Sequence, residues 1–256
     1  MGQEESTKVT RDIRILFRSE SGTFRWYIQP DVIIHELEGD GRVCYRSENK
    51  AVHGGGGAGF LQRIIANGHE SVLEHINLTA SITCSRACSH QIVRHRLCAF
   101  SQESQRYVNY EKKGYEIIVP ECIRNLDTEN KVGGMGFWKW QPWVFDSTQG
   151  NPVIENDMAG EFYQGCITAL HHYQNLLGMG CKPEDARFLL PNAMSTRLRM
   201  SANIRQWRHI FRERALNSHA QWEIKNVMGQ ILDQAVRALP CLFEDLVEKK
   251  RVYSCE

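Results

Sequence analysis

The stretch over residues 91–107 constrains this chain most, because it gathers an unusual amount of polar chemistry in one short span. It contains three Arg, one His, two Ser, three Gln and one Glu. An arginine side chain offers a planar fork of donors that matches phosphate or carboxylate oxygens two at a time, and it stays charged at any working pH. The stretch therefore indicates an anion site. A basic surface helix followed by a polar loop is the alternative that composition leaves open.

Apolar spacing predicts the elements on either side of this stretch. Residues 78–83 alternate apolar and polar side chains, which is typical of a strand with one buried face. Ser85 is placed to cap a helix that runs on to about residues 98–100, with Gln91, Arg94 and His95 on one face. Residues 101–106 are then expected to form a polar loop over whatever the helix binds.

Helices outnumber strands in the rest of the pattern, and the two are intermingled. Residues 31–37 are apolar-rich without a clear assignment. On the helix over 202–215 the arginines lie mostly opposite the apolar side, so most of them are expected to be solvated. The fold class is therefore α+β, or mixed α/β rich in helix. The further strands expected are residues 13–17, 115–120 and 195–200, and the helices are residues 60–67, 157–177, 184–190, 202–215 and 219–239.

The length of the chain favours one domain over residues 1–256. Apolar residues make up 42% and charged residues 24%, which argues against a disordered or membrane class. The net charge of +1 means that any anion binding must come from local clusters. No signal pattern or bilayer-length apolar run is present, so we expect a cytoplasmic protein. Residues 121–156, rich in Gly and Trp, are expected to be an inserted loop, either a lid or a contact surface.

Neither the cysteines nor the histidines predict a metal site. The nine cysteines include no Cys-x-x-Cys pair, so we expect reduced thiols, mostly in the core. His69 and His75 are six residues apart, so one helical face would not present both. The glycine run over residues 54–59 lacks the Gly-Lys-Ser/Thr ending of a nucleotide-binding loop and is expected to be a flexible loop.

Arg94-His95-Arg96, followed after seven residues by Ser104, resembles the signature of the flavin-dependent thymidylate synthases. Other segments resemble blocks of the same family in the same order. They are His-Glu-Ser-Val-Leu-Glu-His at residues 69–75, Ala186-Arg187 through Pro191, Asn203-Ile204-Arg205, and Arg214 followed by residues 219–224. The resemblance extends from about residue 40 to 245.

The resemblance implies an activity, a set of ligands and an assembly. The reaction would be the reductive methylation of deoxyuridine monophosphate (dUMP) to thymidylate (dTMP). Methylenetetrahydrofolate would supply the carbon, and flavin adenine dinucleotide (FAD) reduced by NADPH would supply the hydride. The family forms homotetramers of a mixed α/β fold, with each active site built from several subunits. No metal, nucleic acid or membrane partner is expected.

The resemblance also assigns residues by position. The predicted catalytic residues are Arg214, which would stabilise the ionised uracil ring, and Ser104. Ser101, Gln102 and His209 replace residues that are commoner in the family. The predicted flavin-binding residues are His69, Ser71, Arg94, His95, Arg96, Ser101, Asn203, Arg205, His209 and His219. The predicted nucleotide-binding residues are Gln91, Gln102, Glu103, Ser104, Gln105, Arg106, Arg187 and Arg214.

Two rival functions fit less of the sequence. The other thymidylate synthase class attacks the pyrimidine with a cysteine in a Pro-Cys-His setting, but Pro240-Cys241 is followed by Leu242, so Cys241 is expected in the core. A nucleic-acid-binding module using the arginine-rich helices is opposed by the near-zero net charge and by the absence of an aromatic-plus-basic recognition motif.

Overall fold

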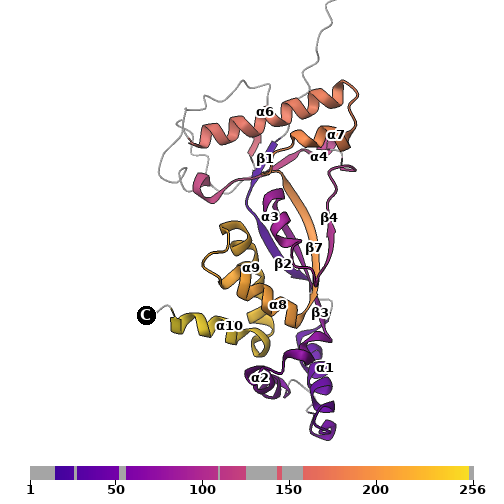
Figure 1. Cartoon of the computed structure of the whole chain (residues 1–256), viewed down its shortest axis with the longest axis vertical. Coiled ribbons are helices and arrows are strands. Elements are labelled where there is room, and N and C mark those ends of the chain that lie inside the picture. The colour runs from indigo at the N-terminus through magenta and orange to yellow at the C-terminus, as the bar shows by residue number, and fades with distance from the viewer. Residues whose placement is uncertain are drawn as a thin grey trace, which may run out of the picture. The chain divides into compact units, whose positions relative to one another are not determined.

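The computed structural model describes residues 15–25, 28–51, 56–108, 110–124, 143–145 and 158–253 (Figure 1). The chain divides into two compact units. Residues 1–19 and 104–195 form the first unit, and residues 20–103 and 196–256 form the second. The prediction of a single catalytic domain stays a prediction.

The first unit is built on a small three-stranded sheet. Strand β1 (Ile15–Arg18) pairs in parallel with β5 (Tyr115–Ile118) and antiparallel with β6 (Trp143–Phe145), so β1 is central. The strands predicted around residues 13–17 and 115–120 are confirmed, and β6 lies within the predicted insertion at 121–156. Residues 125–142 and 146–157, most of that insertion, lie outside the described residues.

Helices complete the first unit. The long helix predicted at 157–177 is confirmed as α6 (Met158–Gly178), and Leu170 and Tyr173 on it pack into a core with Tyr115. The predicted helix at 184–190 is instead a single turn of α-helix followed by a 3-10 turn, with a proline at the start as expected. The short elements are α4 (Tyr110–Lys113), α7 (Pro183–Ala186) and η5 (Arg187–Leu189).

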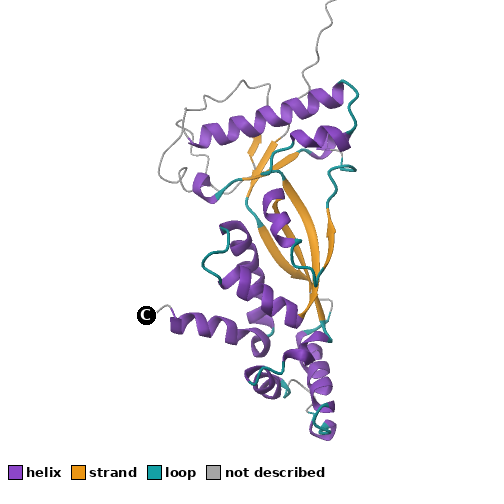
Figure 2. Cartoon of the chain, in the orientation of Figure 1, coloured by secondary structure: helices purple, strands orange, loops and turns teal. Residues whose placement is uncertain are grey.

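The second unit contains a four-stranded sheet in the order β2-β3-β7-β4 (Figure 2). The strands are β2 (Ser21–Arg25), β3 (Asn77–Ser85), β4 (Ala99–Gln102) and β7 (Ser195–Asn203). Buried and accessible residues alternate along β2, β3 and β7, so one face packs into the core and the other is polar. The strands predicted at 78–83 and 195–200 are confirmed.

Helix α9 (Trp222–Ala238) covers the inner face of this sheet at β2 and β3. Its apolar residues are buried at the spacing that the sequence predicts, and Trp207 packs edge-on against Phe24 at 5.0 Å between ring centroids. The remaining helices are α1 (Pro30–Val43), η1 (Glu48–Lys50), α2 (Ala58–Ala66), η2 (Glu70–Glu74), α3 (Arg86–Ile92), α8 (Ile204–Ile210), η6 (Phe211–Leu216) and α10 (Pro240–Tyr253).

Two sequence-based expectations need correction in this unit. Helix α3 ends at Ile92, so Gln91, Arg94 and His95 do not share a helical face. The expected loop begins as strand β4, because residues 99–102 pair antiparallel with β7. Residues 31–37, which the sequence left unassigned, belong to the first half of α1. Helix α9 ends just before Pro240 as predicted, and α10 begins at that proline.

Arg208 is buried, although it belongs to a group that was expected to be mostly solvated. Its guanidinium donates to both Asp245 carboxylate oxygens at 2.7 Å, to Glu70 at 3.1 Å and to the carbonyl of Leu242. It therefore joins α8, η2 and α10 around one cation. Among the described residues, no helix is long and apolar enough to cross a membrane.

Candidate active site

A hydrogen bond joins Arg214 to the buried His95 in the second unit. His95 lies just after α3 and is only 8% exposed, whereas Arg214 belongs to the π-helical turn η6. The Nε of Arg214 donates to Nε2 of His95 at 3.2 Å. Isolated π-helical turns occur frequently at functional sites, because the extra residue changes the direction of a side chain. The contact fixes one edge of the guanidinium.

The electrostatics keep His95 able to accept this hydrogen bond. Burial and the charge of Arg214 lower the pKa of His95 to about 4, with a further contribution from His209, whose ring centroid lies 6.4 Å away. Both effects disfavour a second positive charge on the imidazole. His95 is therefore neutral at neutral pH, with Nε2 as the acceptor.

Some of the residues predicted to bind the nucleotide lie on or next to strand β4. Gln102 donates from Nε2 to the hydroxyls of Ser89 at 3.0 Å and Thr196 at 3.2 Å, so its amide is fixed between α3 and β7. The backbone N–H of Glu103 donates to the carbonyl of Arg197 at 2.9 Å, which extends the pairing by one residue. Ser101 is exposed and lies opposite Arg199 in the register.

In the first unit, Arg106 and Arg187 both contact Glu184. The Nε of Arg106 lies 3.7 Å from the Glu184 carboxylate, and the Nε of Arg187 donates to the Glu184 carbonyl at 2.9 Å. The hydroxyl of Ser104 accepts from the backbone N–H of Arg106 at 3.3 Å, and Gln105 lies in the same turn. The structure therefore brings Ser104, Arg106 and Arg187 into one neighbourhood.

The residues predicted to bind flavin are spread over several elements of the second unit. Arg94, Arg96, His209 and His219 are exposed, as are Ser71 and His69, whose Nδ1 lies 3.0 Å from the Tyr45 hydroxyl. Arg205 pairs with Glu74 at 2.5 Å. The amide oxygen of Asn203 caps α8 by accepting from Gln206 N–H at 2.8 Å, which leaves its NH2 group for a ligand.

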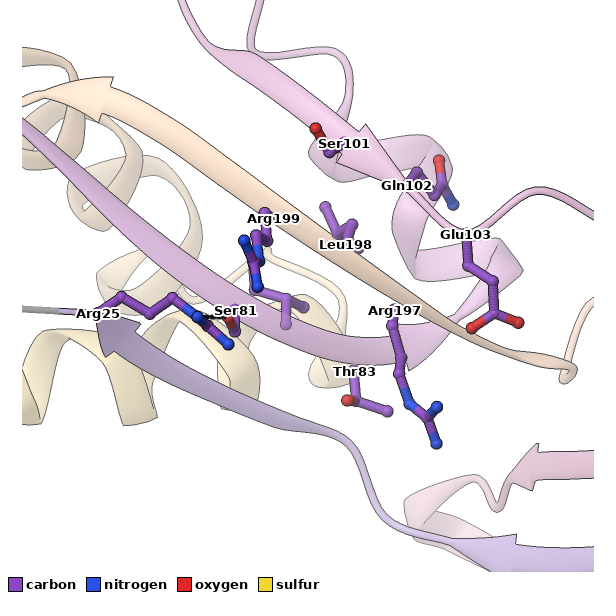
Figure 3. A pocket seen from close by; sticks show the side chains of 10 residues that line it. Arg25, Ser81, Thr83, Ser101, Gln102, Glu103, Arg197, Leu198 and Arg199 are labelled. Carbon is purple, nitrogen blue, oxygen red and sulfur yellow. Dashed lines mark hydrogen bonds between the residues drawn. The ribbon is translucent and has the colours of Figure 1, made fainter. Parts of the chain in front are cut away.

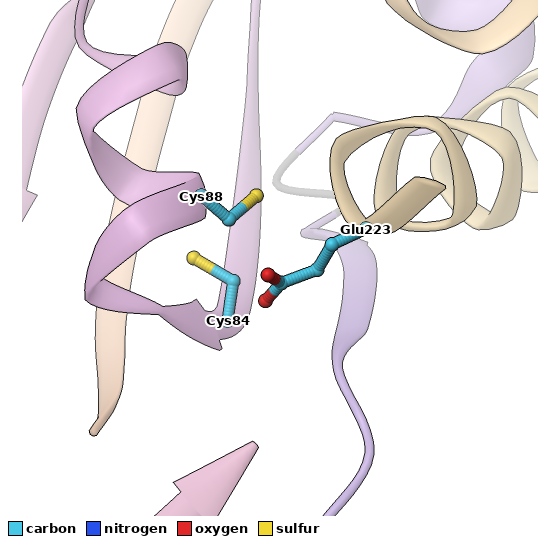
Figure 4. A group of neighbouring side chains, drawn as sticks. All are labelled: Cys84, Cys88 and Glu223. Carbon is cyan, nitrogen blue, oxygen red and sulfur yellow. The ribbon is translucent and has the colours of Figure 1, made fainter. Parts of the chain in front are cut away.

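Cys84, Cys88 and Glu223 form a buried cluster whose thiol and carboxylate ligand atoms all lie within 4.8 Å of one another (Figure 4). These are zinc-ligand types, but the Glu223 carboxylate already accepts from the Ser85 backbone N–H and hydroxyl, both at 2.6 Å. The hydrogen bond with Cys84 and burial raise the pKa of the Cys88 thiol. The cluster therefore consists of two thiols beside a carboxylate that holds Ser85, the residue before α3. The expectation that the protein binds no metal stays a prediction.

A set of arginines that the sequence did not single out lines the outer face of the four-stranded sheet. Arg25, Arg197 and Arg199 surround a cavity of about 540 Å³ with several hydroxyl side chains (Figure 3). The alternation along residues 195–200 predicted a strand, and hence that Arg197 and Arg199 share a face. Their proximity to Arg25 depends on strand order, which the sequence does not contain.

A mixed, helix-rich fold with grouped arginines, hydroxyls and a neutral buried histidine is the kind of arrangement found in enzymes that act on phosphorylated substrates. The chain matches the family described as "Thymidylate synthase complementing protein" over residues 36–241. The chain belongs to this family, that of the flavin-dependent thymidylate synthases, which confirms the resemblance read from the signature.

Individual relatives of this chain carry the name of the same family. The chain is 35% identical over 187 residues to a flavin-dependent thymidylate synthase of Geobacter sulfurreducens, covering 73% of this chain and 68% of the relative. The enzyme of the same name from Pyrococcus furiosus is 33% identical over 180 residues, covering 69% of this chain and 62% of the relative. A solved UMP/dUMP methylase PolB from Streptomyces cacaoi, bound with 5-Br dUMP, has a TM-score of 0.65 at 22% identity and covers 91% of this chain and 96% of its own. That likeness supports the helix-rich α+β fold.

Proposed function

We propose that this protein is a flavin-dependent thymidylate synthase that methylates dUMP to dTMP. Methylenetetrahydrofolate supplies the carbon, and FAD reduced by NADPH is the source of the hydride. Family membership supports the reaction class. The observation that carries the proposal is the hydrogen bond from Arg214 to a neutral, buried His95. This bond orients the Arg214 guanidinium, whose remaining N–H donors can then stabilise negative charge that develops on the substrate.

Arg214 stabilises the ionised uracil ring in this proposal. Its Nε is taken by His95, so the two terminal NH2 groups are the donors left for a carbonyl oxygen of the pyrimidine. Because the guanidinium is already oriented, little reorganisation is needed when charge develops on the ring. In this arrangement His95 orients Arg214. The resemblance to the family signature had instead predicted that His95 contacts the flavin.

The neighbourhood around Glu184 is proposed to bind the nucleotide phosphate. Arg106 and Arg187 supply two cationic forks, and the Ser104 hydroxyl can donate to a phosphate oxygen while it accepts from Arg106 N–H. Ser104 therefore binds substrate in this scheme and is not a covalent nucleophile. The other residues proposed for the nucleotide are Gln91, Gln102, Glu103 and Gln105.

The donors of the second unit fit a flavin dinucleotide. Arg94 and Arg96 are exposed beside His95 and suit a pyrophosphate, and the free NH2 group of Asn203 suits an isoalloxazine edge. The flavin, when bound, supplies the hydride chemistry that no side chain can supply. The other residues proposed to hold it are His69, Ser71, Ser101, Arg205, His209 and His219.

We also propose a homotetramer in the cytoplasm. Large apolar side chains are exposed directly beside proposed ligand-binding arginines, with Leu97 at 78%, Tyr107 at 79% and Phe188 at 83%. Such residues next to polar ligand sites suit sites that a second subunit completes. Free thiols at the described cysteines suit a reducing compartment. Molar mass from light scattering tests the assembly, and a monomer at assay concentration would contradict it.

Flavin binding and turnover test the function directly. We expect the purified protein to be yellow or to take up FAD, to bleach with NADPH, and to form dTMP from dUMP and methylenetetrahydrofolate. Arg214→Ala should retain flavin and lose at least about two orders of magnitude in rate, as when an oxyanion-type donor is removed. A protein that takes up no flavin, or one whose Arg214→Ala variant turns over normally, would contradict the proposal.

A further inference from the structure

The outer face of the four-stranded sheet carries a cavity whose three arginines have no role in the proposed function. Its lining also includes Ser101, Gln102 and Glu103, which are proposed flavin and nucleotide residues. Its volume is about 540 Å³, and three arginines contribute to its lining from two strands, Arg25 from β2 and Arg197 and Arg199 from β7 (Figure 3). The hydroxyls of Ser81, Thr83 and Ser101 lie among them. We refer to the three arginines together with Ser81 and Thr83 as the sheet-face site.

The pleat of the sheet explains why these side chains gather. Arg197 and Arg199 are two residues apart on β7, and the Leu198 side chain between them is buried in the core. The register places Ser101 opposite Arg199, and Nε of Arg25 donates to the Ser81 hydroxyl at 2.6 Å. The cations are therefore presented on one face of rigid strands and not on a loop.

The charge of the cavity suits an anionic ligand. Its lining includes three arginines and one carboxylate, Glu103, in a chain whose formal net charge is only +1. A phosphate or carboxylate group in the cavity could accept hydrogen bonds from the arginines and from the nearby hydroxyls. The outer face of an antiparallel sheet is ordinarily polar, and here that face presents three arginines around one cavity.

We propose that the sheet-face site binds the anionic end of one of the two co-substrates, and this inference rests on the proposed function. The shared chemistry is a cluster of phosphate or carboxylate oxygens, which comes either from the glutamyl tail of the folate or from the phosphates of NADPH. The dUMP phosphate has its own arginines, Arg106 and Arg187, in the other unit.

The test is the double variant Arg197→Gln/Arg199→Gln in the full-length, FAD-loaded protein. Its matched control, Arg63→Gln/Arg237→Gln, removes the same charge from exposed positions on α2 and α9. We expect the sheet-face variant to raise the KM of one co-substrate by about tenfold, the equivalent of about 1.4 kcal/mol, while the control does not. Flavin content, dUMP affinity and molar mass should stay unchanged.

Two comparisons identify which co-substrate is bound. If the site holds the folate tail, wild-type protein should prefer folate with several glutamates over the monoglutamate, and the variant should lose that preference. If the site holds NADPH, the variant should bind NADPH more weakly, with the folate constants unchanged. Unchanged constants for both co-substrates would overturn the inference, as would a loss confined to flavin binding, dUMP binding or assembly.

Calorimetric titration separates this inference from the proposed function. NADPH and tetrahydrofolate are titrated into the wild-type and variant proteins without turnover. Weaker binding of one of them to the variant supports the sheet-face site even if no dTMP is formed, in which case only the proposed reaction fails. Equal binding to both proteins overturns the site even if dTMP is formed.

Discussion

Replacing His95 by Gln should remove a defined part of the pH dependence of stability. The folded-state pKa of His95 is about 4, below the ordinary value of 6.5, because burial and Arg214 disfavour its protonated form. The unfolded chain therefore takes up a proton at His95 as the pH falls below about 6.5, whereas the folded protein does not until about pH 4. Stability is full above the unfolded pKa and declines as the pH falls between the two values.

The size of the effect follows from these two pKa values. Between about pH 7.5 and about pH 5 the linkage amounts to about 2 kcal/mol, and partial solvent contact of the imidazole reduces it to about 1 kcal/mol. The carboxyl of Glu70 lies outside this window, because its pKa is lowered from 4.5 by Arg212 and Arg208 in spite of burial. Between these two pH values, the change in the free energy of unfolding therefore reports on His95 and not on Glu70.

Urea unfolding at the two pH values measures the effect. The wild-type protein should lose about 1 kcal/mol more than His95→Gln between them, since glutamine can still accept from Arg214 but does not titrate. His90→Gln, at an exposed position on α3, is the matched control and should follow the wild type. If the free energies of unfolding of His95→Gln and wild type fall in parallel, the account of a neutral His95 is wrong.

Three further variants test other contacts. Arg208→Met should destabilise the fold by about 2–3 kcal/mol in urea unfolding, because Asp245 and Glu70 lose charge-assisted hydrogen bonds while Glu70 keeps Arg212; a cost under about 1 kcal/mol would mean the cation is not needed. Glu223→Gln should cost about 1–3 kcal/mol in the same assay, since a neutral amide is a weaker acceptor for Ser85; unchanged stability would contradict its capping role. Ser104→Ala should weaken dUMP binding in titrations by about tenfold yet retain turnover, whereas normal binding without chemistry would point to a nucleophile.

Local sequence signals predicted the parts of the fold that depend on neighbours in the chain. The apolar spacing of residues 60–65 and the glycine at 68 predicted α2, and Gly68 has a φ of 75°, a conformation that glycine adopts readily. Ser85 caps α3 as predicted, accepting from Cys88 N–H at 3.0 Å. These features are encoded within a few residues of where they act.

Features that depend on distant partners were not predictable in the same way. Residues 99–102 are polar enough to resemble a loop and become a strand only because β7 supplies the pairing edge. Arg208 has the same spacing as its solvated neighbours, and its burial depends on Asp245, which lies 37 positions further along the chain. A helical wheel cannot distinguish an arginine facing water from one facing a carboxylate that arrives with another helix.

The three adjacent residues of the family signature also differ in burial. Arg94, His95 and Arg96 are adjacent in sequence, but the structure buries only the histidine, where it contacts Arg214, and leaves both arginines exposed. These three residues lie between the end of α3 at Ile92 and the start of β4 at Ala99, outside any helix or strand. In the function proposed above, the signature therefore combines two roles: the buried His95 orients Arg214, and the exposed Arg94 and Arg96 are available to the flavin.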